Sequence, residues 1–133
     1  MTKVLYPGSF DPMTKGHMNI VEQASDLFDE VIIAVMQNPL KKSGLFTLDE
    51  RMEIIKELYQ RMNNVRVISA SGAAVDVALL NECKAIIRGL RSLSDYDYEV
   101  QLADVNKDIS RYVDPIVRER MLVKKRSLIR WVK

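Results

Sequence analysis

The sequence predicts an α/β fold in which an open parallel sheet is covered by helices on both faces. Four short apolar runs rich in β-branched residues are typical of buried parallel strands, and they lie at residues 3–6, 30–36, 65–69 and 84–89. Helix-like patterns separate these runs, and this alternation indicates consecutive βαβ units. With 133 residues, 47% of them hydrophobic, the chain is long enough to bury one core, so we expect a single domain over residues 1–133.

The predicted helices are recognised by apolar residues at helical spacing. They begin near His17, span residues 47–62 and 73–82, and begin again near Ser94. The second of them opens with "TLDE", in which Thr47 and Glu50 have the spacing of a capping box.

Composition excludes several classes of protein. Cys83 is the only cysteine, so neither an intrachain disulfide nor a cysteine zinc cluster can form, and we interpret it as a partly buried bystander. No apolar run approaches the roughly 20 residues of a membrane helix, and the N-terminal apolar run is too brief for a signal peptide. We therefore expect a cytoplasmic protein with no membrane partner.

Charge is distributed unevenly along the chain. Residues 111–133 hold 8 basic and 2 acidic side chains, whereas the first 110 residues hold 12 basic and 16 acidic ones. A basic segment of this kind either binds nucleic acid or an anionic surface, or is a solvated end. Its aromatic residues, Tyr112 and Trp131, are far apart, which favours the solvated end, and we expect no nucleic-acid partner.

Glycines, prolines and basic residues gather where the predicted strands end. The segments that follow the strands are "PGSFDPMTKGH", "QNPLKKSG", "ASGAAVD" and "RGLRS". Ligands of open parallel sheets bind beyond the carboxyl ends of the strands. Three of the four segments carry basic side chains, namely His17, Lys41, Lys42, Arg88 and Arg91. The sequence therefore predicts an anion-binding site at this edge of the sheet.

The chemistry of this edge favours phosphate as the anion. Gly8 and Gly16 let the backbone approach a phosphate closely, and the helix that begins near His17 offers unpaired N–H groups. His17 can donate to phosphate oxygens as a neutral imidazole or as an imidazolium, although a histidine there is also common as a structural cap. Arg88 ends a buried strand, where its charge costs desolvation free energy unless it meets an anion. Because neither a Ser–His–acid set nor a metal-ligand spacing can be assembled, we expect direct transfer between bound phosphates.

The segment "YPGSFDPMTKGH" resembles the first motif of the nucleotidyltransferases that carry an H-x-G-H or T-x-G-H signature. In detail it is similar to the G-[ST]-F-D-P-x-T-x-G-H motif of the bacterial phosphopantetheine adenylyltransferases, with Thr14 where several relatives carry a first histidine. The similarity continues through "NPLKKSGLFTLDER", "SGAAVDVA" and "IIRGLRSLSDYDYEVQLADVN", and so covers about residues 3–110. It implies a Rossmann-like nucleotidyltransferase fold.

The resemblance also implies an activity and the residues that serve it. Adenylate would pass from ATP to 4′-phosphopantetheine by in-line displacement without a protein nucleophile, giving dephospho-coenzyme A and pyrophosphate, with Mg²⁺ as cofactor and usually in a hexamer. Catalytic roles would fall to His17, Lys41 and Arg91, with no metal ligand supplied by the protein. The acceptor site would be formed by Ser9, Lys41, Ala73, Ala74 and Arg88. The ATP site would be formed by Ser9, Phe10, His17, Gly89, Leu90, Arg91 and Glu99.

The resemblance ends near Ser110. Members of the family continue with a strand, an S-S-S-x-[ILV]-[KR] segment that binds ATP phosphates, and a closing helix. The stretch "RSLIRW" can be laid over that segment, which would add Ser127 and Arg130 to the ATP site. We expect residues 111–133 to be an atypical end of the domain that is diverged, truncated or frameshifted.

Two alternatives to an active enzyme of this family stay open at this point. One is a relative that binds coenzyme A-like ligands or nucleotides without turnover, for which the segment 111–133 is the argument. The other is a nucleotidyltransferase with a different acceptor, against which Thr14 and "IIRGLRSLSDYDYE" both argue.

Overall fold

The computed structural model describes residues 1–37, 44–89, 122–124 and 127–131. Its strands are β1 (Lys3–Gly8), β2 (Glu30–Met36), β3 (Val65–Ala70), β4 (Ala85–Gly89), β5 (Leu122–Lys124) and β6 (Ser127–Trp131). Its helices are α1 (Lys15–Leu27), α2 (Leu48–Leu58) and α3 (Ala74–Leu80). The four strands expected from apolar runs are therefore confirmed, as are the first three helices. The helix expected near Ser94 lies outside the described residues.

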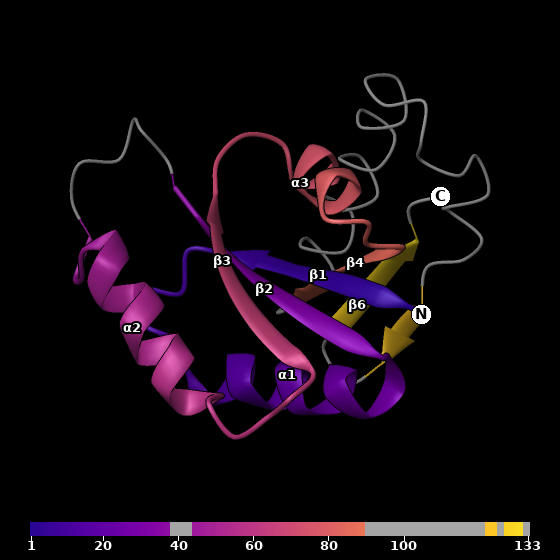
Figure 1. The fold of residues 1–133 in the computed structure, drawn as a ribbon, viewed down its shortest axis with the longest axis horizontal. Helices are drawn as coiled ribbons and strands as arrows, with labels where there is room; N and C mark the ends of the chain where they lie inside the picture. Colours follow the sequence, from indigo (N-terminus) through magenta and orange to yellow (C-terminus); the bar gives the residue numbers. More distant parts are fainter. Residues whose placement is uncertain (38–43, 90–121, 125–126, 132–133) are drawn as a thin grey trace.

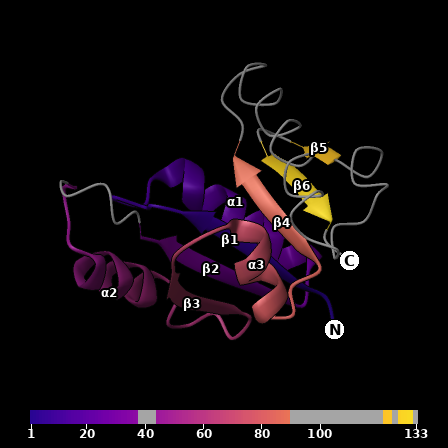
Figure 2. The same cartoon turned by 90° about the horizontal axis from the view of Figure 1, so that it is seen from above.

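The sheet has the strand order β3-β2-β1-β4-β6-β5. The first four strands are parallel, which confirms the predicted open parallel sheet. Strand β6 then runs antiparallel to β4, and β5 runs antiparallel to β6. Figure 2 shows these two strands, in yellow, beside β4 at one edge of the sheet. An antiparallel edge on a parallel sheet is common in mixed α/β folds.

Helices cover both faces of the sheet, as predicted. Helices α1 and α2 lie on one face and α3 lies on the other (Figure 1). Alternate residues of each strand point to opposite faces, so Val31, Ile33 and Val35 of β2 belong to the core under α1 and α2. Ile32 and Ala34 belong to the core under α3. Full burial of each valine or isoleucine side chain stabilises the fold by about 1.5–3 kcal/mol.

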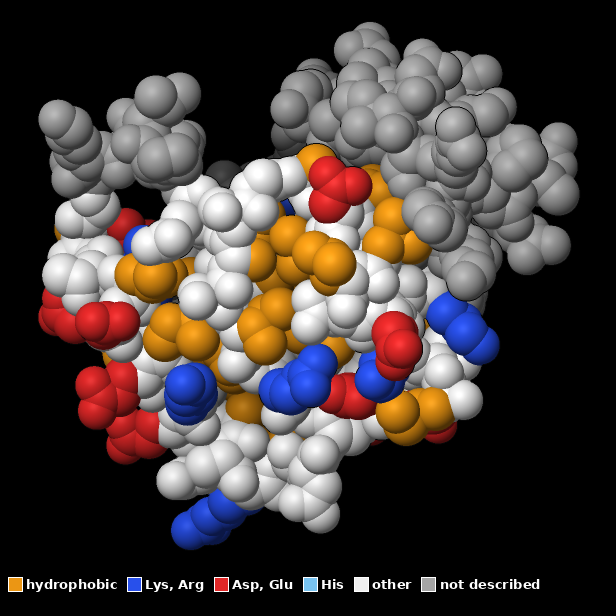
Figure 3. Space-filling view, turned by 45° about the horizontal axis from the view of Figure 1, so that its top comes forward, with side chains coloured by type: hydrophobic (Ala, Val, Ile, Leu, Met, Phe, Trp, Pro, Cys, Tyr) orange, Lys and Arg blue, Asp and Glu red, His pale blue; other side chains and the backbone are white. Residues whose placement is uncertain are grey.

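Of the described helices, α3 alone lies on the second face of the sheet (Figure 1), and at seven residues it covers only part of that face. Met36, Ile68 and Ala70 pack against the α3 core but stay partly exposed. Figure 3 shows apolar side chains gathered at the surface on this side. Among the residues that the structure describes, no helix is long and apolar enough to cross a membrane.

Candidate active site

The loop between β1 and α1 forms a tight corner around Phe10. Phe10 is buried and has a φ of 48°, in the left-handed region that non-glycine residues seldom adopt. Its ring lies beneath Gly8, where an added Cβ would stand 3.0 Å from Phe10 Cζ, so only glycine fits there without displacing the ring. Ser9, between them, is exposed at the tip of the corner. The backbone thus turns sharply with its tip open to solvent.

His17 lies at the third position of α1 and closes a capping box with Thr14. The Thr14 N–H donates to His17 Nδ1 over 2.9 Å, and the His17 N–H donates to Thr14 Oγ1 over 3.4 Å. The Thr14 hydroxyl also lies 3.0 Å from Nδ1. The half-buried imidazole meets the Phe10 ring in a T-shaped contact with centroids 5.2 Å apart, and Tyr6 lies 6.3 Å away. The ring is therefore held from its backbone side and from the core.

The first turn of α1 contains no acidic residue. A helix start carries a partial positive charge and N–H groups without helical partners, and both favour an anion when no carboxylate neutralises them. Lys15 and Gly16, the first two residues of α1, are exposed. The start of α1 can therefore receive a phosphate group at the open side of the corner.

Three hydrogen bonds tie α2 and the residues just before it to this corner. The Asp11 carboxylate accepts from the backbone N–H of Leu45 (3.0 Å) and of Phe46 (2.8 Å). Arg51 of α2 donates from Nη1 to the carbonyl oxygen of Ser9 over 2.8 Å. The motifs "GSFDP" and "LFTLDER" contain Asp11 and Arg51, but no role for either residue was predictable from the sequence. Spacing within a motif gives no signal for contacts between residues this far apart in the chain.

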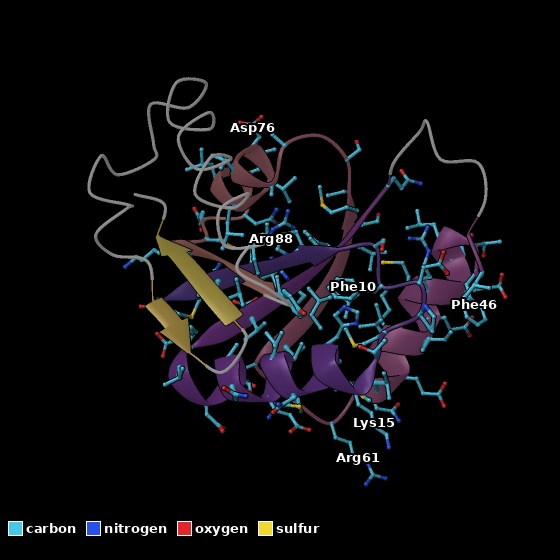
Figure 4. The ribbon with its side chains drawn as sticks, turned by 180° about the vertical axis from the view of Figure 1, so that it is seen from behind. Phe10, Lys15, Phe46, Arg61, Asp76 and Arg88 are labelled. Atoms are coloured by element: carbon cyan, nitrogen blue, oxygen red, sulfur yellow. The ribbon has the colours of Figure 1, made fainter. Side chains whose placement is uncertain are left out.

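The carboxyl end of β4 lies beside β1 and presents side chains to both faces. Arg88 lies two residues after Ile86 along β4, so both residues are on the same face of the sheet, and Ile86 belongs to the α3 core. The Nη1 atom of Arg88 lies 3.5 Å from the carbonyl oxygen of Pro7. Gly89 faces α1, because a Cβ added there would stand 3.2 Å from Ile20 Cδ1. In Figure 4, Arg88 is labelled on the α3 side of β1 and Phe10 on the side of α1.

Ala73 and Ala74 begin α3 on the same side as Arg88. Ala73 is the N-terminal cap residue and Ala74 the first residue of the helix, and both are half-buried. Ala74 packs against the α3 core together with Ala70. The structure thus brings these two predicted acceptor residues to the end of β3, at the same edge as the ends of β1 and β4.

The remaining predicted residues either lie outside the described residues or are described by their backbone pairing alone. Lys41, Leu90, Arg91 and Glu99 lie outside the described residues. The backbone of Ser127 pairs with Gly89, at the edge where the parallel strands end. The backbone of Arg130 pairs with Ile86, three residues back along β4.

Two groups with raised pKa values belong to the core. Burial raises the pKa of the Cys83 thiol to about 11, so it is a neutral side chain in the α3 core, as its interpretation as a bystander requires. Burial likewise raises the pKa of Tyr59 to about 12, and its hydroxyl donates to the sulfur of Met13 over 3.6 Å. Neither group has the character of a nucleophile at neutral pH.

Comparison with known proteins decides the family. Residues 5–129 match a family model described as Cytidylyltransferase-like. The chain is 51% identical over 116 residues to the phosphopantetheine adenylyltransferase of Heliobacterium modesticaldum, a match that covers 87% of this chain and 68% of the relative. The chain belongs to the phosphopantetheine adenylyltransferase family. This result confirms the resemblance inferred from the motifs.

Further relatives of the same name agree. The phosphopantetheine adenylyltransferase of Clostridium kluyveri is 43% identical over 116 residues, covering 87% of this chain and 70% of the relative. That of a Synechococcus strain is 46% identical over 114 residues, covering 86% and 68%. Residues 14–17, which the sequence analysis compared with the T-x-G-H signature, are the N-cap and the first three residues of α1.

Proposed function

We propose that this chain transfers adenylate from ATP to 4′-phosphopantetheine, forming dephospho-coenzyme A and pyrophosphate. The proposal rests on one observation: at the end of β1, the predicted site residues lie on two opposite faces of the sheet. His17, Phe10 and Gly89 lie toward α1, whereas Arg88, Ala73 and Ala74 lie toward α3. Two phosphate-bearing substrates can therefore approach the same strand end from opposite faces of the sheet.

The reaction needs no covalent intermediate on the protein. A phosphate oxygen of the acceptor attacks the α-phosphorus of ATP and forms the new P–O bond. The bond from that phosphorus to the oxygen that bridges to the β-phosphorus breaks, and pyrophosphate leaves with the electron pair. Such a transfer depends on positioning and on stabilisation of charge at the phosphate oxygens.

The α1 side binds the donor. The N-terminal N–H groups of α1 and the imidazole of His17 stabilise charge on the transferring phosphate. Gly89, whose missing side chain leaves room next to Ile20, lets the nucleotide approach β4, and Ser9 and Phe10 contribute to the corner. Leu90, Arg91 and Glu99 complete this side by the family resemblance. Ser127 and Arg130 are assigned to it by the weaker resemblance of "RSLIRW".

The α3 side binds the acceptor. The guanidinium of Arg88 pairs with the acceptor phosphate, and Lys41 and Ser9 assist by the family resemblance. The pantetheine arm is a chain of amides and methylene groups that suits the partly exposed apolar surface of Met36, Ile68 and Ala70. Ala73 and Ala74 extend that surface toward Arg88.

The cofactor, the oligomeric state and the cellular compartment are proposed from the family resemblance. The described residues contain no group of three or more His, Cys, Asp or Glu side chains that could hold a metal ion. We propose Mg²⁺ as the cofactor and expect it to arrive with ATP, because nucleotide phosphates commonly hold this ion with few protein ligands. We also propose a homo-oligomer, a hexamer as in the family, that works in the cytoplasm as a single domain over residues 1–133.

The test is to incubate the chain with ATP, Mg²⁺ and 4′-phosphopantetheine and to measure pyrophosphate. We expect release that depends on both substrates. Binding of both ligands without release would make the chain a non-catalytic relative. Faster turnover with CTP, or with nicotinamide mononucleotide as acceptor, would assign it a different reaction.

A further inference from the structure

The capping box at the start of α1 determines which nitrogen of His17 carries a proton. The Thr14 backbone N–H lies 2.9 Å from Nδ1, and a backbone N–H can only donate. Nδ1 must therefore present its lone pair. A neutral imidazole has one proton, and it resides on Nε2 whenever Nδ1 is the acceptor.

We propose that Thr14 is a positioning residue that holds His17 in the Nε2–H tautomer, so that a neutral N–H donor meets the substrate phosphate. The Thr14 hydroxyl strengthens this selection, because it lies 3.0 Å from Nδ1 and can donate to the same lone pair. This inference rests on the proposed function for its catalytic consequence, but the tautomer itself can be measured without turnover.

The aromatic contacts add the orientation that the tautomer requires. The Phe10 and His17 planes meet at 82°, and the Phe10 ring is buried beneath Gly8. The imidazole is thus held at Nδ1 by Thr14 and at its side by Phe10. Rotation of the ring would break the Thr14 contact, so the donor at Nε2 keeps one direction before substrate arrives, which is the condition for electrostatic preorganisation.

The cap also opposes a proton on Nδ1. Protonation of Nδ1 would place two donors face to face across 2.9 Å and would break the bond from the Thr14 N–H. Charge stabilisation at the phosphate then comes from an oriented N–H dipole and the start of α1. His17 gives up no proton in this role, and none is required by the displacement.

The direct test uses the fact that the chain contains one histidine. Labelling with ¹⁵N-histidine gives NMR signals from His17 alone, and the couplings of the two ring nitrogens to the ring protons identify the tautomer. We expect Nε2 to be protonated and Nδ1 to be unprotonated in the ligand-free protein. A protonated Nδ1, or signals averaged between the two tautomers, would overturn the proposal whatever the enzyme's activity.

The second test separates positioning from helix capping. Thr14→Val removes the hydroxyl at α1, and Thr47→Val removes the matching hydroxyl at the start of α2. Both variants should lower Tm to a similar extent, because each loses an N-cap bond. We expect only Thr14→Val to lower kcat, by about 10- to 100-fold with little change in KM, and to change the histidine signals. Thr14→Ser should restore both.

Two results would contradict a positioning role for Thr14. Equal kcat losses in the two valine variants would mean that Thr14 only caps helix α1. Unchanged histidine signals in Thr14→Val would mean that the hydroxyl has no part in selecting the tautomer. Failure of the proposed function looks different, because every variant would then be inactive while the wild-type signals still reported the Nε2–H tautomer.

Discussion

Helices α1 and α2 begin with the same local structure, a threonine cap that exchanges two hydrogen bonds with the third helical residue. In α2 the Thr47 N–H donates to Glu50 Oε1 over 3.1 Å, and the Glu50 N–H donates to Thr47 Oγ1 over 3.2 Å. In α1 the partner of Thr14 is His17, with distances of 2.9 and 3.4 Å. The two boxes differ mainly in the side chain that accepts from the cap residue.

That difference changes what each helix start can bind. The first turn of α2 contains Asp49 and Glu50, which neutralise its own positive end and repel an external anion. The first turn of α1 contains no carboxylate, so its positive end is left for a ligand. His17 satisfies the cap as Glu50 does, and it adds an N–H at the opposite side of the ring. The same capping geometry therefore accompanies a neutralised helix start in α2 and, in α1, a helix start whose charge suits a phosphate.

The largest effect is expected when the α1 box is converted into the α2 box. His17→Glu should still accept from the Thr14 N–H, so the protein should fold with a Tm close to that of the wild type. Its carboxylate would repel the phosphates, and we expect kcat to fall at least 10²–10³-fold, as for loss of a transition-state donor. Thermal unfolding and pyrophosphate release measure the two properties. His17→Ala should lose similar activity and also some stability.

Two outcomes of the His17→Glu experiment would differ from this prediction. A His17→Glu variant that turns over normally would show that the two boxes are equivalent and that the phosphate lies elsewhere. A variant that does not fold would show that the imidazole is a packing element first, in which case the His17→Ala kinetics decide.

The next largest effect is expected on the acceptor side of the site, which has no capping box of this kind. If α1 binds only the donor, the acceptor phosphate must depend on Arg88, and Arg88→Ala should weaken 4′-phosphopantetheine binding by about 1.5–3 kcal/mol. ATP binding should change much less. Calorimetric titration of each ligand separately measures both. Arg61→Ala is a suitable control, because this arginine is exposed in the turn that follows α2, well away from Arg88 (Figure 4). Equal losses for both ligands would contradict the division.

A smaller effect is expected where the loop before α1 contacts the segment before α2. Asp11→Ala removes the acceptor of the Leu45 and Phe46 N–H groups, which should lower the free energy of unfolding by about 1–3 kcal/mol. Gly44→Ala should act in the same direction, because a Cβ at Gly44 would collide with the Asp11 carboxylate. Urea denaturation measures both variants. If neither is destabilised, the two loops are held together by other contacts.

The parallel strands were predictable because buried parallel strands are continuous apolar runs, although β1 extends two residues past its predicted end, to Gly8. The end of α2 was predicted too late, at residue 62, whereas the helix ends at Leu58. Tyr59 and Met62 continue the apolar spacing and still pack against the core, but from a turn, so periodicity alone cannot locate the last helical residue. The antiparallel direction of β6 was not predictable either, since it depends on pairing with a distant strand.

The site shows the same limit. His17 and Arg88 could be proposed as site residues because basic residues at strand ends leave a signal in the sequence. The contacts that hold the corner together join residues 34 to 42 positions apart, and such pairs leave no periodicity to detect. The role of Thr14 was also missed, because a histidine is not the usual third residue of a capping box.

The smallest effect is expected where α2 ends beside the α1 box. Tyr59 is the C-cap residue of α2, and its hydroxyl donates to Met13, the residue before Thr14. Because burial raises its pKa from 10.0 to about 12, the unfolded chain ionises this hydroxyl before the folded protein does. Its contribution is therefore fully present below pH 10 and is lost as the pH rises toward 12. Tyr59→Phe should remove that loss, so its stability relative to the wild type should rise between pH 8 and pH 10.5 by under about 1 kcal/mol. Urea denaturation of both proteins at the two pH values measures this, and a constant difference would mean that the hydroxyl is as accessible in the folded protein as in the unfolded chain.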